Sequence, residues 1–373
     1  MKPTFAADRA TLGQNLRGAE EGNRKKIEIA KVEGLDRHAE SDLYATAAAP
    51  HRISLCPAAI PSSIPAQSTL APTIFHEEWW LDAATMGRYA IAEVSANGRT
   101  VGRLPYVLRR RFGLQGVWTP PMTYFLGPAV DEGAGSPNCR FLRKLEITRE
   151  LIQKLPQASW QCVRCHRGVT DVIAFQELAF RTYVQFTNEL EPRPAKNLWS
   201  QLRNKTRNVI RRAQEQFDVV ECLDIDEFIY SYVKNLDARR VQNTLDLSAC
   251  RRLLQAAQER SRGRIVTARN AKNEMVAANF CAWDAGASFY IACTRNAAAG
   301  NGATSLLLWD SIQHAARRNL IFDFAGIGNR GSILHYAGFG AAIAPRYVAV
   351  RATGFGRLTN AVRSLFTESH FLF

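Results

Sequence analysis

A glycine-bearing turn runs into an amphipathic helix and then a short apolar strand over residues 299–324. Glycine lets backbone N–H groups approach an anion closely and accepts positive φ angles. The positive end of the helix dipole favours a phosphate or pyrophosphate at such a turn. We expect the anion at Gly300, Asn301, Gly302, Ala303 and Thr304, with Thr304 capping the helix. An ordinary loop-capped helix is the alternative interpretation of the same residues.

Helical and strand patterns alternate on both sides of this turn. Helical spacing predicts helices over Leu198–Gln216, Asp224–Leu236, Leu247–Arg260, Gly331–Gly338 and Arg357–Phe366. Short apolar runs predict strands over Arg264–Arg269, Met275–Trp283, Ser288–Thr294, Ile321–Phe324 and Arg346–Arg351. This succession indicates an α+β fold around a central sheet.

The chain before Lys196 divides into two stretches. Residues 1–72 carry mixed charges and then an Ala/Pro/Ser-rich run, a composition typical of a flexible leader and linker. Beyond them the pattern predicts helices over Phe75–Ala84, Asn138–Leu155 and Asp171–Leu178, and strands over Tyr89–Val94, Thr100–Arg111, Trp160–His166 and Arg181–Asn188. We therefore expect a leader over 1–72, one unit over 73–195 and a second over 196–373.

The charge of the chain favours an anionic partner. The formal net charge is +14, the isoelectric point is about 9.7, and most of the excess follows Lys196. This balance suits CoA, a nucleotide-linked substrate or an RNA, although a basic surface without a particular partner has the same composition. No run approaches the roughly 20 apolar residues of a spanning helix, and the N-terminus has no signal-peptide core, so we expect a cytoplasmic protein.

Eight scattered cysteines predict reduced and mostly packed thiols. Cys162, Cys165 and His166 match the CxxCH pattern of c-type haem attachment. The lack of an export signal and the strand-like surroundings favour a core strand instead. Neither a haem nor a metal site is predicted, because no further ligand spacing is present.

Two groups of polar residues are candidates for chemistry. Arg203, Lys205, Arg207 and Arg211 lie in one predicted helix, which could contact an anion or simply be solvated. Asp323, His335, Tyr336 and Tyr347 could transfer protons. For the tyrosines, packing in the core with a satisfied hydroxyl is the alternative role, and for the histidine a structural one.

Several segments together resemble FemAB-like members of the GNAT superfamily. The segments are LW…RNKTRNVIRRA at Leu198–Ala213, the helix Gly302–Ala316, IFDFAGI at Ile321–Ile327 and YAGFGAAIAPRY at Tyr336–Tyr347. Phe75–Leu81 and Thr182–Leu190 are also similar, so the resemblance covers about residues 73–350. It implies two GNAT-like units in tandem, a degenerate first one and a second that transfers an acyl group to an amine.

The resemblance also implies roles for residues of this chain. Gly300, Gly302, Ala303 and Thr304 would bind the donor phosphates, Asp323 would be the base or orient the amine, and Tyr336 or Tyr347 would protonate the leaving thiolate. Two departures concern the donor. Ala297 stands where CoA-binding members typically carry Gln or Arg, and the coiled-coil arm of Fem-type factors is absent between Gln216 and Gly263.

Three functions follow. The first is an N-acyltransferase that moves an acyl group, in the first place acetyl, from acyl-CoA to an amine of an amino sugar or cell-envelope precursor. The second is aminoacyl-tRNA-dependent transfer to a peptidoglycan precursor, with tRNA as partner. The third is a non-catalytic GNAT-like protein that binds a polyanion. The acceptor and the oligomeric state are not determined by the sequence, since one scaffold hosts many acceptors.

Overall fold

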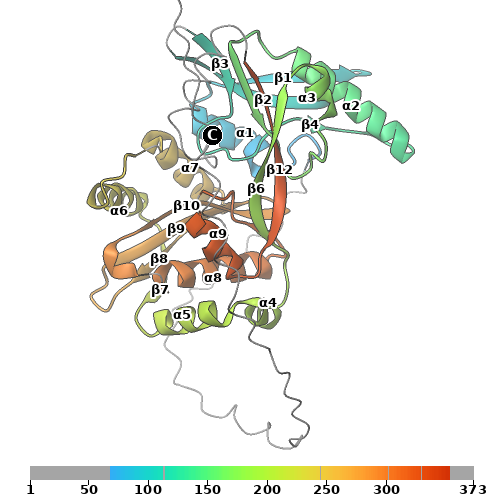
Figure 1. The fold of residues 1–373 in the computed structure, drawn as a ribbon. Coiled ribbons are helices and arrows are strands. Elements are labelled where there is room, and N and C mark those ends of the chain that lie inside the picture. The colour runs from blue at the N-terminus through green and yellow to red at the C-terminus, as the bar shows by residue number, and fades with distance from the viewer. Residues whose placement is uncertain (1–67, 112–113, 244, 301, 329, 353–373) are drawn as a thin grey trace, which may run out of the picture. The chain divides into compact units, whose positions relative to one another are not determined.

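A computed structural model describes residues 68–111, 114–243, 245–300, 302–328 and 330–352 (Figure 1). The predicted helix Arg357–Phe366 and most of the predicted leader lie outside these residues. Within them, the strands form one mixed sheet in the order β1-β2-β3-β5-β12-β6-β11-β10-β9-β8-β7, and β4 pairs with β2. The fold is therefore α+β, as the sequence predicts.

The elements before Lys196 build one end of the sheet. They are η1 (Ile74–His76), α1 (Glu78–Thr85), β1 (Ala90–Ala96), β2 (Arg99–Arg111), β3 (Leu114–Trp118), β4 (Ala129–Val130), α2 (Pro137–Gln153), β5 (Trp160–Arg164), α3 (Ile173–Glu177) and β6 (Arg181–Leu190), and α4 (Ala195–Gln201) follows.

All but the last of the remaining elements build the other end. They are α5 (Asn204–Gln214), β7 (Asp218–Cys222), α6 (Ile225–Ala238), α7 (Leu247–Glu259), β8 (Gly263–Arg269), β9 (Met275–Trp283), β10 (Ala287–Arg295), η2 (Ala297–Ala299), α8 (Gly302–Arg317), β11 (Ile321–Asp323), α9 (Arg330–Ala337) and β12 (Ala342–Ala352).

The same arrangement of a strand, a helix and a parallel strand occurs once in each half. β3 and β5 are parallel neighbours joined through α2, and β10 and β11 are parallel neighbours joined through α8. This repetition is the tandem architecture that the resemblance implies. The last strand, β12, lies between β5 and β6 and is antiparallel to both, so the end of the described chain completes the sheet of the first half (Figure 1).

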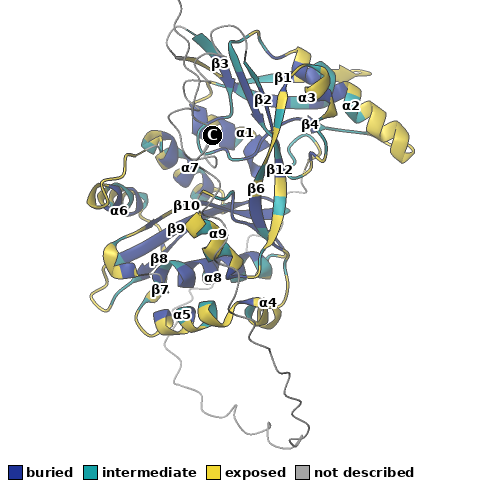
Figure 2. Cartoon of the chain, viewed as in Figure 1, coloured by how far each residue is buried: buried dark blue, intermediate teal, exposed yellow. Residues whose placement is uncertain are grey.

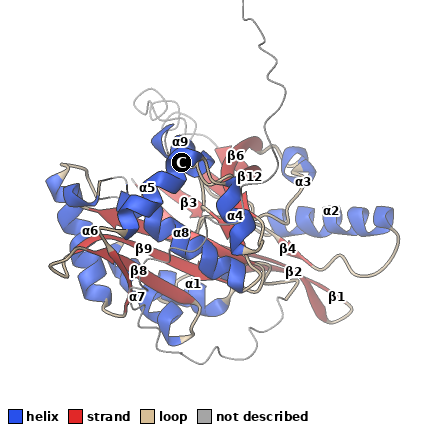
Figure 3. Cartoon of the chain, turned by 90° about the horizontal axis from the view of Figure 1, so that it is seen from below, coloured by secondary structure: helices blue, strands red, loops and turns tan. Residues whose placement is uncertain are grey.

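Helices cover both faces of the sheet in the second half (Figure 3). Alternate strand residues explain the two layers: Phe280 and Phe289 point into a core with α1, α6 and α7, whereas Trp283 and Tyr290 point into a core with α4, α5 and α8. Figure 2 shows that α8 is largely buried. A helix between the sheet and α5 buries two sides, so its apolar residues extend nearly around it.

The structure corrects three predictions of secondary structure. The helix predicted over Leu198–Gln216 is broken, because Leu202 and Arg203 are extended and separate α4 from α5. Strands β3 and β7 were not predicted, since both are short and lack regular alternation of apolar residues. β5 confirms the strand pattern at Trp160–His166. Cys162 in this strand and Cys165, directly after it, are free, buried thiols.

Two buried histidines join the first helical turn to the loop after β5. The imidazole rings of His76 and His166 pack edge to face, with centroids 5.1 Å apart. Because carbonyl oxygens only accept, Nε2 of each ring donates, to Gly127 O at 3.2 Å and to Pro128 O at 3.0 Å. Nδ1 of His166 accepts from Gly168 N–H at 3.1 Å, so this ring is neutral.

Acid should destabilise the fold through this pair. Burial lowers the pKa of His166 from 6.5 to about 4, so its contribution is complete above pH 6.5 and is lost as the pH falls toward 4. We expect the free energy of unfolding in urea to fall by roughly 2 kcal/mol between pH 7.5 and pH 5 from this group. His166→Gln, which cannot titrate, should be less stable at pH 7.5 and should show a smaller loss. An equal loss in both proteins would contradict the assignment.

Candidate transfer site

β10 and β11 part soon after they meet. They pair in parallel over three residues, from Ala287 opposite Ile321 to Phe289 opposite Asp323. β10 then continues to Arg295, while the chain after Asp323 turns away. Backbone groups beyond Phe289 on this edge thus have no β11 partner, and a backbone edge of this kind can bind an extended ligand.

A β-bulge distorts β10 where this gap opens. The register against β9 shifts between Tyr290 and Ala292, which leaves Ile291 as the extra residue. The Ile291 carbonyl accepts a hydrogen bond of 2.7 Å from the hydroxyl of Tyr124, a residue of the first half. Sequence analysis missed Tyr124, because it lies in an apolar, turn-rich segment with no recognisable motif.

An exposed thiol lies just past the bulge. Cys293 is solvent-exposed and influences the pKa of Tyr124, Tyr290 and Tyr336. The structure thus gathers tyrosines from β10, α9 and the first half around one exposed position on the free edge. No sequence signal distinguished Cys293 from the other cysteines.

The predicted anion turn lies at the far end of β10. Gly300 has φ 51° and ψ −148°, a conformation that requires glycine, and a Cβ added there would meet nothing within 4 Å. The Arg295 guanidinium donates to the Gly300 carbonyl at 2.8 Å and holds the turn. First-turn N–H groups of α8 follow directly and have no intrahelical acceptor. Asn301 lies outside the described residues.

Thr304 does not have the capping role predicted for it, and packing gives a further reason for the glycine at position 302. Thr304 is not the cap, because α8 begins at Gly302 and the Thr304 hydroxyl is buried without a partner. A Cβ added at Gly302 would lie 3.1 Å from the Cβ of Ala213. Glycine at this position therefore serves the close packing of α8 on α5. Ala303 is fully buried as well.

His335 and Tyr336 are neighbours on α9, but they contact different elements. Nε2 of His335 lies 3.1 Å from the Ser305 hydroxyl in the first turn of α8, and burial lowers the pKa of this histidine. Burial raises the pKa of Tyr336 to about 12, so its phenol keeps the proton at neutral pH. The Tyr336 ring packs on Phe324, which directly follows β11, with centroids 4.4 Å apart. Both residues therefore border the gap, one at the turn and one at the end of β11.

Tyr347 lies elsewhere. It belongs to β12, opposite Val184 of β6, and packs against the core of the first half. The structure does not bring it to Tyr336, although the sequence places both among the candidates for proton transfer.

Asp323 faces neither a cleft nor solvent. Its exposed fraction is 0%, and one carboxylate oxygen accepts from the Thr187 hydroxyl at 2.6 Å and from Ala325 N–H at 2.7 Å. The other oxygen accepts from the Arg346 guanidinium at 2.9 Å, and Arg346 also pairs with Glu189. Burial raises the pKa of Asp323, and the nearby Arg346 charge opposes this shift. The carboxylate is thus the centre of a buried network at the end of β11.

The predicted anion-binding helix contains two kinds of basic residue. Arg207 donates to the carbonyls of Ser200 (3.0 Å) and Leu202 (2.8 Å), so it satisfies the last turn of α4. Arg203, Lys205 and Arg211 are exposed and form no ion pair with a described residue, and Arg211 also stacks on the Trp199 ring. Three of the four predicted residues are therefore available to an anion.

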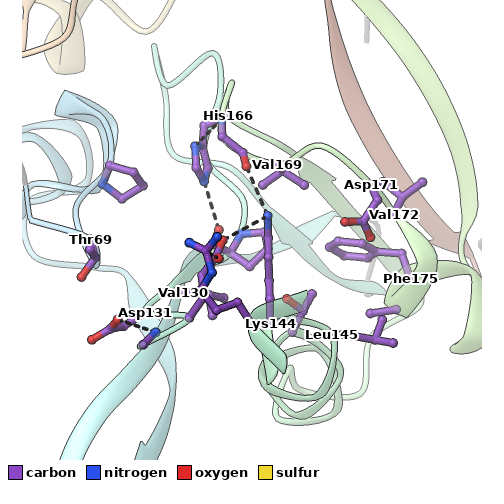
Figure 4. A pocket seen from close by; sticks show the side chains of 18 residues that line it. Thr69, Val130, Asp131, Lys144, Leu145, His166, Val169, Asp171, Val172 and Phe175 are labelled. Atoms are coloured by element: carbon purple, nitrogen blue, oxygen red, sulfur yellow. Dashed lines mark hydrogen bonds and ion pairs between the residues drawn. The ribbon is translucent and has the colours of Figure 1, made fainter. Parts of the chain in front are cut away.

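A separate cavity of about 410 Å³ lies in the first half (Figure 4). Its apolar wall includes Val169 and Phe175, and its mouth carries Asp131, Lys144 and Asp171. None of its lining residues belongs to β10, β11 or α8, so this cavity is distinct from the gap. No cluster of three metal-binding side chains is present among the described residues.

Comparison with known proteins finds a match to a family model in the second half. Residues 200–336 match the family model described as Acetyltransferase (GNAT) domain. The crystal structure of FemX shares the fold, with a TM-score of 0.57 at 12% identity over 73% of this chain and 90% of that one. The C-terminal domain of a putative lysylphosphatidylglycerol synthetase from Agrobacterium fabrum has a TM-score of 0.51 at 13% identity, over 79% and 95%. No curated protein matches by sequence. Among the described residues, no helix has the length and apolar character to cross a membrane.

Asp323→Asn should separate a structural role from a chemical one. The amide would replace one of the two acceptor oxygens by a donor, although Thr187, Ala325 and Arg346 all donate to this group, and would leave Glu189 as the remaining carboxylate partner of the buried guanidinium among the described residues. We expect the free energy of unfolding to fall by roughly 3–5 kcal/mol, measured in urea. Glu78→Gln, at an exposed ion pair with Arg103, is the control and should change stability by less than about 1 kcal/mol. Unchanged stability with abolished transfer would instead indicate a base.

Proposed function

Since residues 200–336 match a GNAT acetyltransferase domain and the fold is similar to that of FemX, we propose that this chain transfers an acyl group, in the first place acetyl, from acyl-CoA to an amine. The acceptor that we propose is an amino sugar or another cell-envelope precursor in the cytoplasm. The observation that carries this proposal is the gap between β10 and β11, with the bulge at its mouth and the Gly300 turn at the end of its free edge.

The residues around the gap fit a phosphorylated thioester. The Gly300 turn leaves open space, and the N–H groups that begin α8 have no intrahelical acceptor and can donate to the donor phosphates. The free edge of β10 runs from this turn toward Phe289 and offers backbone hydrogen bonds to an extended chain. Burial lowers the pKa of His335, which lies beside Ser305. Its ring is therefore neutral at pH 7 and adds no positive charge at the turn.

The reaction is a direct displacement. The amine nitrogen attacks the carbonyl carbon, the C–S bond breaks, the amine releases its proton to solvent at the exposed edge, and the thiolate takes up a proton. We assign that proton to Tyr336, because its phenol is protonated at neutral pH and borders the gap at the end of β11; solvent then returns a proton to the phenolate. Asp323 is assigned to holding the end of β11, since both its oxygens are already engaged. Tyr347 receives no role.

Two glycines of one turn provide a matched test. Gly300→Ala places a side chain in a conformation that costs roughly 1–3 kcal/mol, so the turn must change shape. We expect the KM for acyl-CoA to rise about tenfold, which corresponds to about 1.4 kcal/mol. Gly302→Ala meets Ala213 of α5 instead and should lower the melting temperature with little change in KM. The same KM for acyl-CoA in the wild type and in both variants would remove the turn from the donor site.

A second candidate for the donor is aminoacyl-tRNA. It is favoured by exposed cations in α5 and at Arg203, the residue before this helix. Arg203, Lys205, Arg211 and Arg212 are exposed and form no ion pair with described residues. Clustered cations without carboxylate partners release counterions when they bind a nucleic acid.

Charge reversal separates the two donors. Arg211→Glu with Arg212→Glu should weaken tRNA binding at least about tenfold at fixed salt if α5 contacts phosphates, as measured by fluorescence anisotropy. Arg109→Glu with Arg110→Glu, at exposed positions of β2, is the matched control and should change binding less. Equal effects of the two pairs would leave acyl-CoA as the proposed donor. Binding of either donor without acylation of any amine would favour the non-catalytic alternative.

A further inference from the structure

One segment of the first half, residues 123–126, contacts β10 directly and β11 through Arg346 of β12. Its first residue, Thr123, accepts a hydrogen bond of 3.1 Å from the Trp80 indole. Its last residue, Leu126, donates to the Arg164 carbonyl of β5 at 2.8 Å. Both ends of the segment are thus fixed to the first half, and Tyr124 and Phe125 between them reach the second.

Tyr124 reaches β10 at the bulge. Its hydroxyl donates to Ile291 O at 2.7 Å, two residues beyond Phe289, the last residue of β10 that pairs with β11. Burial raises the pKa of Tyr124, so its hydroxyl remains a donor at neutral pH. This contact therefore holds the backbone at the position where the gap opens.

Phe125 reaches the other border. The Arg346 guanidinium lies over its ring, 5.2 Å from the centroid. Arg346 in turn binds the Asp323 carboxylate at the end of β11. Neighbouring residues of one rigid segment thus act on β10 directly and on β11 through one arginine.

We propose that Tyr124 is a positioning residue for acyl transfer, supplied by the first half to the site of the second. The peptide group is planar, so fixing the Ile291 carbonyl also fixes the N–H of Ala292. Backbone donors stabilise a developing oxyanion only when they are held in place beforehand. The inference rests on the proposed acyl transfer at this gap, and it explains why a degenerate unit accompanies the catalytic one.

Tyr124→Phe is the test, because it removes only the hydroxyl. We expect kcat to fall about tenfold or more, with the KM for acyl-CoA within about twofold and a melting temperature lowered by no more than about 2–4 °C. The pH profile of kcat should keep its shape, since a positioning residue does not exchange the proton. Tyr106→Phe is the control, because the Tyr106 hydroxyl has no hydrogen-bond partner among the described residues, and its kcat should equal that of the wild type.

Hydrogen exchange tests the contact independently of activity. Loss of one hydrogen bond of about 1 kcal/mol should make amides of residues 290–295 exchange about fivefold faster in Tyr124→Phe than in Tyr106→Phe. If exchange is faster in Tyr124→Phe but the wild type acylates no amine, the proposed reaction is wrong and the contact with Ile291 is still supported. Equal exchange in the two variants, or an unchanged kcat in Tyr124→Phe, would overturn the positioning role.

Discussion

The buried ion pair between Asp323 and Arg346 holds together the part of the sheet where the two halves join. Asp323 ends β11, Arg346 lies in β12, and Thr187 of β6 donates to the same carboxylate. A carboxylate with no exposed surface is stable in its charged form only when its partners are close and well oriented. Three strands from distant parts of the chain must therefore assemble before any of these groups is satisfied.

The position of this network explains the shape of the gap. β11 has only three residues. Phe324 N–H still donates to the Asn188 carbonyl of β6, and the chain then turns so that Ala325 N–H donates to the Asp323 carboxylate. The strand cannot continue beside β10, because its last carboxylate is held from the side of β6 and β12. The gap is thus a consequence of where β11 is anchored, and the free edge of β10 becomes available to a ligand.

The two halves differ in how they use the same topology. In the second half, the β-bulge and the glycine turn follow the residues of β10 that pair with β11, and tyrosines lie around the bulge. In the first half, the strand–helix–strand unit instead directs Tyr124 and Phe125 onto its neighbour. A rigid supporting shell places reacting groups more precisely than loops do, because its own side chains are locked by packing.

The sequence pattern predicted much of the site, and the features that it did not predict have physical explanations. Regular apolar spacing predicted α8, β9, β10 and β11, since their periodicity reports burial directly. The break at Leu202 was not predicted, because residues on both sides favour helix and only the docking of α4 and α5 separates them. Gly302 was predicted from its position in the turn, whereas its close packing against Ala213 depends on the docking of α5.

The sequence by itself determined the alternation of elements, the glycine turn and the cationic helix, because these depend on neighbours within a few residues. Only the tertiary structure decided that Asp323 is enclosed, that Tyr347 faces the first half and that Tyr124 meets the bulge. Those outcomes depend on contacts between residues more than a hundred positions apart, such as Tyr124 and Ile291. Local propensity carries no information about such contacts, since they form only when the strands of both halves close into one sheet.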